Sequence, residues 1–283
     1  MNTPILRMKN HTSRTVRNSL IAAAMAVTLH TSSAAMLLEY KLDGNGTNTG
    51  TTGAGNDLTI SGSAPLPTYA GPANPNVPGS TASFDNSALT YNVAGGVASA
   101  GGVTIANNVD FTFSGWLNNK SGAALTGNPR IFDKQASNGG FALQFASATS
   151  LSLVIVNAGG TLGVASSVGF GAQNTWEWFG VTYTQATGSV SFYNLQAGVV
   201  TLLGTNTLSN SVTGYVNTAA ALRILNTGSG VRAYDGYADD LRVFNDKQTV
   251  SQMQALVPEP STWALLAFSL TTVIVLRRRR LHS

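Results

Sequence analysis

The sequence predicts an all-β fold in which two antiparallel sheets pack together or close into a barrel. Short runs rich in β-branched and aromatic residues recur from about residue 36 to residue 256. Clusters of Gly, Asn, Ser and Thr separate these runs, as expected for turns between strands. No long stretch has the 3.6-residue period of a helix. Many short strands with glycine-rich turns are typical of sandwiches and barrels.

The individual strands follow from alternation of apolar and polar residues. In the run 109–117, Val109, Phe111 and Phe113 share one face. The run 150–157 is almost continuously apolar, which is typical of a strand buried on both faces. Residues 185–188 end in glycine and predict a four-residue hairpin loop. A short helical turn is expected at 249–256. The other expected strands are 141–145, 178–184, 189–193 and 236–244.

The segment 61–80 is expected to be a surface loop within one domain rather than a domain boundary. It contains five prolines, which lack the backbone donor that a sheet needs. These prolines are Pro65, Pro67, Pro72, Pro75 and Pro78. No repeat of fixed period indicates a solenoid or a propeller. One sandwich domain over 36–256 is therefore predicted.

The order of these strands also resembles a known family. The matching segments are 38–43, 83–85, 111–117, 130–134, 140–144, 178–183, 188–193 and 236–244. In this order and spacing they resemble the laminin G-like (LamG), concanavalin A-like jelly roll. The resemblance implies two curved antiparallel sheets in which the first and last strands lie side by side. It would bring Asp43 near Asp239 and Asp240.

The basic charge of the chain lies at its two ends. The whole chain has a formal net charge of +4 and a pI near 9.5. Residues 36–256 carry eight basic and eleven acidic residues, a net charge of 8 − 11 = −3. A mildly acidic body argues against nucleic acid as a partner, because phosphate binding needs a basic surface.

The residue types present exclude several kinds of catalytic and metal site. The chain has no cysteine, and His11, His30 and His282 all lie near its ends. The body therefore has no Ser-His-Asp or Cys-His machinery and none of the usual zinc ligands. Disulfides are excluded too, so the body must depend on a packed core.

A calcium site is one expectation that the resemblance raises. LamG-like domains often hold one calcium ion at a sheet edge, and calcium prefers oxygen ligands. Because successive strand residues face opposite sides, one of Asp239 and Asp240 is expected to turn inward and the other to be solvated. The alternative is that the candidates are ordinary turn residues. The candidates are Asp43, Asn56, Asp57, Asp239 and Asp240.

Enzymatic activity is not expected, and no catalytic residue is assigned. Glycosidases use two carboxylates across the scissile bond, and the body has only two glutamates, Glu39 and Glu177. Glu177 is interpreted as a residue at the entry of a strand. Sugar binding would need exposed aromatic residues. Trp116 is interpreted as core packing, and Tyr69 and Tyr215 near loops are the candidates for ligand contact.

The N-terminus predicts secretion. Residues 1–19 are polar and basic, 20–29 are apolar, and Ser33, Ala34 and Ala35 supply small residues before a cleavage point. This order is typical of a signal peptide that signal peptidase removes. Cleavage is expected near Ala35, which leaves residues 1–35 as a leader.

The C-terminus has three parts with distinct physical properties. Residues 257–262 contain two prolines that keep the backbone extended and accessible. Residues 261–276 are uncharged and predict a short membrane-spanning helix, slightly below the length of about 20 residues that spans prefer. The basic stop that follows predicts a cytoplasmic C-terminus, and consists of Arg277, Arg278, Arg279 and Arg280.

This pattern resembles the PEP-CTERM sorting signal. The resemblance rests on Val257, Pro258, Glu259 and Pro260 directly before an apolar segment and a terminal basic cluster. It implies processing at the motif by an exosortase of a Gram-negative bacterium. The body would then reach the cell surface or the exopolysaccharide matrix after transient anchoring in the inner membrane. A plain membrane anchor is the alternative.

Together these features predict an exported, sorted protein with a binding or structural jelly roll. Its expected ligand is an exopolysaccharide, another glycan or a protein, with calcium as the one expected cofactor. Two alternatives stay open: a carbohydrate-active hydrolase or lyase, and a purely architectural matrix protein.

Overall fold

The fold is known from a computed structural model that describes residues 35–86, 95–120, 125 and 127–257. Almost all of the expected leader lies outside these residues. So do the apolar segment, the arginine cluster and all of the expected Val257–Pro260 motif except Val257. Among the described residues, no helix is long and apolar enough to cross a membrane.

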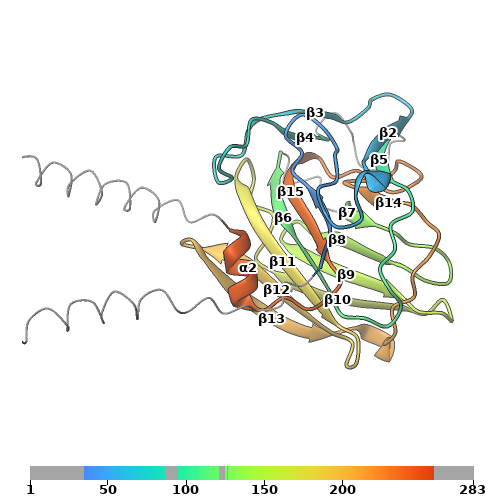
Figure 1. Cartoon of the computed structure of the whole chain (residues 1–283). Helices are drawn as coiled ribbons and strands as arrows, with labels where there is room; N and C mark the ends of the chain where they lie inside the picture. Colours follow the sequence, from blue (N-terminus) through green and yellow to red (C-terminus); the bar gives the residue numbers. More distant parts are fainter. Residues whose placement is uncertain (1–34, 87–94, 121–124, 126, 258–283) are drawn as a thin grey trace, which may run out of the picture. The chain divides into compact units, whose positions relative to one another are not determined.

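The described chain forms an all-β sandwich of two antiparallel sheets (Figure 1). The first sheet has the strand order β13-β12-β11-β6-β15-β4-β3, and β1 also pairs with β15. We call it the terminal-strand sheet, because it contains both β1 and β15. Its strands are β1 (Met36–Tyr40), β3 (Thr68–Gly71), β4 (Ser83–Asp85), β6 (Phe111–Asn119), β11 (Trp176–Thr184), β12 (Ser189–Gln196), β13 (Val199–Thr207) and β15 (Gly236–Phe244).

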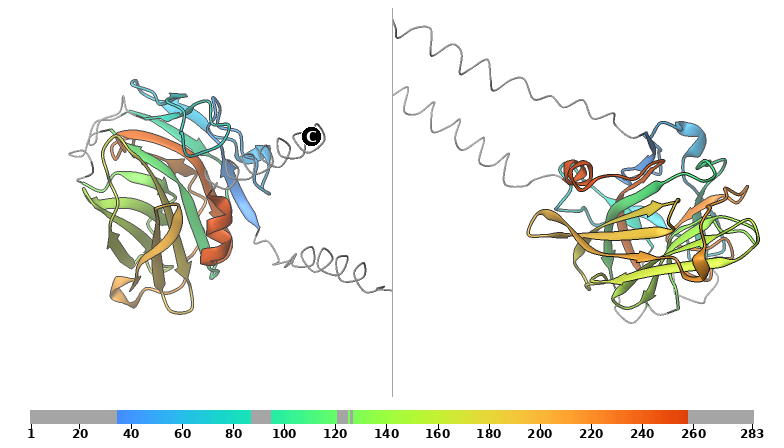
Figure 2. Two further views of the ribbon diagram at one scale, coloured as in Figure 1. Left: turned by 90° about the vertical axis from the view of Figure 1, so that its left-hand side faces the viewer. Right: turned by 90° about the horizontal axis from the view of Figure 1, so that it is seen from below.

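The second sheet packs against the first and has the order β10-β9-β8-β7-β14-β5-β2. We call it the opposite sheet; Figure 2 shows the two layers from two further sides. Its strands are β2 (Thr59–Gly62), β5 (Gly96–Ala100), β7 (Arg130–Asp133), β8 (Phe141–Ser147), β9 (Ser150–Val156), β10 (Leu162–Val168) and β14 (Leu222–Ile224). Two short 3-10 helices, η1 (Ala54–Asn56) and η3 (Ser209–Ser211), lie in the connections.

The main core lies between the two sheets and is rich in aromatic rings. Phe113 of β6 stacks on Phe132 of β7, with ring centroids 5.1 Å apart. Phe111 packs edge-on against Tyr215 at 5.4 Å. Both phenylalanines of β6 are fully buried, because alternation turns them to the same side of the strand. Rings that contact one another in this way add stability beyond the area they bury.

A second apolar cluster lies on the outer face of the terminal-strand sheet. It consists of Trp116, Trp178, Tyr193, Val200, Met253 and Val257. The last two belong to helix α2 (Val250–Leu256) and the residue that follows it. Thr249 caps this helix by accepting the backbone N–H of Gln252, and the Gln252 side chain accepts the Thr249 N–H in return. This capping box fixes where the helix begins.

The strands expected from the sequence are confirmed, with shifts of a few residues at their ends. The 236–244 strand is reproduced in full as β15, and 150–156 is buried on both faces. The 61–80 segment is not wholly a loop, because Thr68–Gly71 forms β3 beside β4. Its prolines lie outside this strand, so they do not interrupt the β3 ladder.

Candidate functional site

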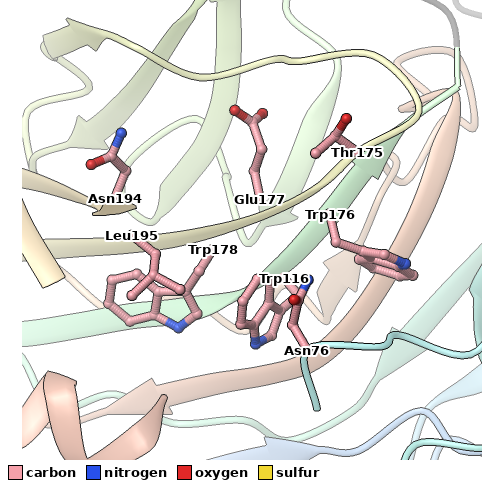
Figure 3. Close-up of a pocket in the computed structure, with 8 residues that line it drawn as sticks. All are labelled: Asn76, Trp116, Thr175, Trp176, Glu177, Trp178, Asn194 and Leu195. Carbon is pink, nitrogen blue, oxygen red and sulfur yellow. The ribbon is translucent and has the colours of Figure 1, made fainter. Parts of the chain in front are cut away.

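A pocket opens on the outer face of the terminal-strand sheet, beside the cluster that α2 covers. Its volume is about 270 Å³, slightly below the range of roughly 300–1,000 Å³ typical for drug-sized ligands. Residues from β6, β11, β12 and the 72–80 connection line it: Asn76, Trp116, Thr175, Trp176, Glu177, Trp178, Asn194 and Leu195. We call this the tryptophan pocket (Figure 3).

Strand register brings the three indoles of the pocket together. Trp176 and Trp178 are two residues apart on β11, so both face the same side of the sheet. Trp116 of β6 is the direct cross-strand partner of Trp178. Figure 3 shows the three rings on one side of β11, with Leu195 and Asn76 beside them.

Two of these indoles carry hydrogen-bond donors that the described protein leaves unused. Trp116 is 2% exposed and Trp178 is 1% exposed. The Nε1 atoms of both are buried, and neither has a partner within the described part of the chain. A buried donor without a partner costs about 1–3 kcal/mol. Both atoms are closed off from solvent, so a ligand oxygen would recover that cost only after a small shift of the indoles opened them to the pocket.

Trp176 supplies the more open aromatic surface of the pocket. It is only partly buried, and it lies beside Tyr237 of β15 with ring centroids 6.5 Å apart and planes tilted by 42°. Aromatic faces of this kind bury much apolar area while their polar tips stay available. The pocket thus combines a partly open ring with two buried donors.

Glu177 is the one acidic residue among the described residues that line the pocket, and its side chain points away from the indoles (Figure 3). Its Oε2 accepts the backbone N–H groups of Gly171 and Ala172, both at 2.7 Å. Burial raises the pKa of Glu177, and these two hydrogen bonds oppose the rise. The carboxylate therefore holds the connection before β11, in agreement with its interpretation as a strand-entry residue.

The two tyrosines expected to contact ligand are used for packing instead. Tyr215 is fully buried and its hydroxyl contacts Asn217 Oδ1 at 3.1 Å, so its assignment as a ligand contact is wrong. Tyr69 lies in β3, packs edge-on against Phe84 at 5.3 Å, and donates weakly to the Leu58 carbonyl at 3.4 Å. Tyr215 lies in the core and Tyr69 packs against it, because burial of a large aromatic residue stabilises the core.

The expected calcium ligands separate into three groups, and two of these hold a buried side-chain oxygen without a partner among the described residues, Asp239 Oδ1 and Asn56 Oδ1. β1 and β15 pair directly, as expected, and Asp43 follows β1. Asp239 is fully buried, its Oδ2 accepts the Ser80 hydroxyl at 3.1 Å, and its Oδ1 has no partner among the described residues. Burial raises the pKa of Asp239 to about 7, helped by the nearby charge of Asp43.

Asp240 belongs to a separate group of four charges that joins the terminal strands. A bulge between Asp239 and Arg242 interrupts the alternation of β15, and Asp240 adopts a φ of 51°. Asp240 is therefore buried beside Asp239 and not solvated, contrary to the sequence expectation. Its carboxylate contacts Lys41 Nζ at 3.0 Å and Arg242 Nη2 at 2.7 Å.

Glu39 completes this group, which we call the terminal-strand charge cluster. Its Oε1 contacts Lys41 Nζ at 2.9 Å and Arg242 Nε at 3.1 Å. Burial by itself raises the pKa of Glu39, but hydrogen bonds from Lys41 and Thr49 and the charges of Lys41 and Arg242 lower it to about 2. Two acids and two bases thus alternate between β1 and β15.

The third group lies in the loop between β1 and β2. The Asn56 carbonyl accepts the Tyr40 hydroxyl at 2.7 Å, and Asp57 Oδ1 accepts the backbone N–H of Asn48 at 2.8 Å. These bonds hold the loop. No cluster of three or more His, Cys, Asp or Glu side chains able to hold a metal occurs among the described residues.

Comparisons with known proteins reveal the fold alone. No family model matches the sequence, and no curated protein matches it. Among solved structures, the receptor-binding domain of botulinum neurotoxin type G is similar with a TM-score of 0.52 and 11% identity, over 78% of this chain and 50% of that one. The serotype D ligand-binding domain in complex with N-acetylneuraminic acid gives a TM-score of 0.53 and 10% identity, over the same shares. The chain therefore spans about half the length of these binding domains.

Proposed function

We propose that this protein is an exported glycan-binding module whose tryptophan pocket holds a sugar. The observation that carries the proposal is the pair of buried, unpartnered indole N–H groups of Trp116 and Trp178 beside the more open ring of Trp176. Sugar hydroxyl and ring oxygens would accept these donors once a small shift of the two indoles opens them, while the apolar face of the sugar packs on the more open ring of Trp176. The pocket volume fits about one sugar ring.

The similarity to binding domains supports this class of function, since one of those proteins was solved with a bound sugar. We further propose that the sandwich is a LamG-like jelly roll, which the side-by-side position of β1 and β15 supports. An array of neutral and acidic glycans, probed with the purified protein, tests the proposal. We expect selective binding of some glycans on the array. An array without any specific signal would contradict the proposal and favour a purely architectural role.

The orientation of Glu177 favours binding over hydrolysis. A glycosidase needs a proton donor and a second carboxylate across the bond. The one acid among the described pocket residues points away from the indoles and accepts two backbone N–H groups. We therefore propose no reaction at this pocket.

For the tail we propose processing by an exosortase at Pro258–Pro260. Val257, the first residue of the motif, is 4% exposed and packs in the outer cluster with Trp116 and Met253, so it is not accessible as expected and cleavage would have to fall after it. The mature protein is expected to lack residues 263–283, as apolar tails are discarded in comparable anchoring signals. Intact-mass measurement of surface material checks this, and the tail still attached would contradict processing.

We also propose that Asp43 and Asp239 hold calcium, which prefers such oxygen ligands. The folded pKa of Asp239, about 7, lies above its ordinary value of 3.8. The contribution of Asp239 to the free energy of unfolding is therefore fully present below about pH 4 and is lost as the pH rises through about 7. Calcium would neutralise the ionised carboxylate. We expect the calcium-induced rise in melting temperature to be small at pH 5 and full at pH 8.

Two variants make this calcium test specific. Asp239→Asn should strongly reduce the calcium-dependent rise at pH 8, because the amide keeps an oxygen but loses the negative charge of the carboxylate. Asp57→Asn, which changes a carboxylate in the separate β1–β2 loop, should leave it intact. Equal calcium effects at both pH values, or a full effect in Asp239→Asn, would contradict the assignment.

A further inference from the structure

A second cleft lies on the opposite sheet, away from the tryptophan pocket, and it is polar rather than aromatic. Its volume is about 330 Å³. The residues that line it come from β2, β5, β14 and the connection after β14: Ser61, Gly62, Ser63, Gly95, Val97, Ser99, Ala221, Arg223, Gly228 and Ser229. Arg223 is the one charged residue among the described residues of this lining, and four serines accompany it. We call this the arginine cleft.

Strand pairing turns Arg223 to the outer face of the opposite sheet. Its neighbours Leu222 and Ile224 are fully buried in the core, so the alternating Arg223 points the other way. Across the strands it is paired with Ser99 of β5 on one side and Asp133 of β7 on the other. The Arg223 side chain is 22% exposed, which leaves part of the guanidinium open to the cleft.

Arg223 is only loosely neutralised by the protein. Its Nη1 lies 3.5 Å from Asp133 Oδ2, longer than a charge-assisted hydrogen bond of about 2.7–2.9 Å. The charges of Arg130 and Arg232 also stabilise the ionised form of the same carboxylate. Arg223 further contributes to lowering the pKa of Lys134 to about 8, after the larger effect of burial. Three of the eight basic residues of the body thus lie around Asp133, and a fourth, Lys134, lies near Arg223, although the body as a whole is acidic.

Gly228 fixes the position of the guanidinium. A Cβ atom at Gly228 would lie 2.6 Å from Arg223 Cζ and 2.7 Å from its Nε and Nη2. The guanidinium therefore packs directly against the backbone of Gly228. A planar guanidinium held in one place can bind a carboxylate through two parallel hydrogen bonds.

We propose that the arginine cleft binds a carboxylated sugar, such as a uronic acid unit of an acidic polysaccharide. Arg223 would pair with the carboxylate, and the hydroxyls of Ser61, Ser99 and Ser229 would bond the hydroxyls of the ring. Among the described residues that line the cleft, none is aromatic and could stack on a nucleobase. One guanidinium among serines matches one carboxylate per sugar better than the dense charge of a nucleic acid.

This inference goes beyond the proposed function, because it concerns a different sheet and a charged class of ligand. The probes are a β-1,4-linked glucuronic acid pentamer and its neutral counterpart, cellopentaose, which has the same linkage and length. Isothermal titration of the purified protein should give a Kd for the acidic pentamer that is lower by about tenfold or more. One charge-assisted hydrogen bond typically changes Kd by this factor. That preference should weaken as salt is added.

Three variants locate the preference. Arg223→Gln should remove it, and Gly228→Ala should also remove it by displacing the guanidinium while the charge is kept. Lys247→Gln removes an equal charge from an exposed loop after β15 and should leave the preference intact. Melting curves confirm that each variant is folded.

The result separates the two sites. Equal affinities for the two pentamers, or an unchanged preference in folded Arg223→Gln and Gly228→Ala, would overturn the inference. A preference that survives Trp176→Ala but not Arg223→Gln supports the arginine cleft even if the tryptophan pocket binds nothing. A preference lost only in Trp176→Ala would place the carboxylate at the other site and overturn the inference.

Discussion

Replacement of Arg242 by methionine is expected to destabilise the fold by about 3 kcal/mol, the largest stability effect among the changes considered. Arg242 is 8% exposed at its side chain and contacts both Glu39 and Asp240, which is 2% exposed. Removal of one partner from a buried ion pair typically costs about 3–5 kcal/mol, because the remaining charges stay buried. Lys41 still contacts both acids, which places the cost at the lower end of the range.

Lys41→Met is the matched control, since it removes an equal charge from the same cluster. The Lys41 side chain is 44% exposed, and exposed ion pairs contribute about 0–1 kcal/mol. Urea denaturation should therefore show a much lower midpoint for Arg242→Met than for Lys41→Met. If the two variants lost equal stability, the terminal-strand charge cluster would not join β1 to β15 as described.

Trp176→Ala is expected to have the largest effect on binding and to weaken the affinity for a neutral glycan roughly thirtyfold. Trp176 is the partly buried indole of the pocket and lies against Tyr237. Truncation of a central aromatic residue in a binding site often costs about 2 kcal/mol or more, which corresponds to that factor in Kd. Titration with the neutral glycan that binds most tightly on the array measures it.

Two control variants belong to this prediction. Trp176→Phe keeps an aromatic face and should retain most of the affinity. Tyr69→Phe alters a tyrosine of β3 that packs on Phe84 of β4. This variant should bind the glycan as the unchanged protein does. Binding that is insensitive to Trp176→Ala, in a variant that melts normally, would remove Trp176 from the site.

The sequence predicts most of the fold because alternation and turn residues are local properties. The hairpin between β11 and β12 follows from the glycine at its end, and β15 follows from its own alternation. The bulge after Asp239 could not be predicted in this way, because it depends on how β15 meets β6. It reverses the expectation for Asp240, which becomes a buried partner of Lys41 and Arg242.

The candidate sites were less predictable, because they depend on pairings between distant segments. The spacing of Trp176 and Trp178 indicates that their indoles share a face, but only the register places Trp116 opposite Trp178. Trp116 is buried as expected, yet its N–H remains without a partner among the described residues. Arg223 carries no local motif. Its place in a cleft depends on β14 lying between β5 and β7.

The most direct test of glycan binding at the tryptophan pocket is to follow the indole N–H signals by NMR during titration. The described residues contain Trp116, Trp176 and Trp178, so each indole signal can be assigned by single replacement. We expect the neutral glycan to shift the Trp116 and Trp178 N–H signals together and saturably, as both donors gain a partner. Binding that leaves both signals unmoved would contradict this expectation.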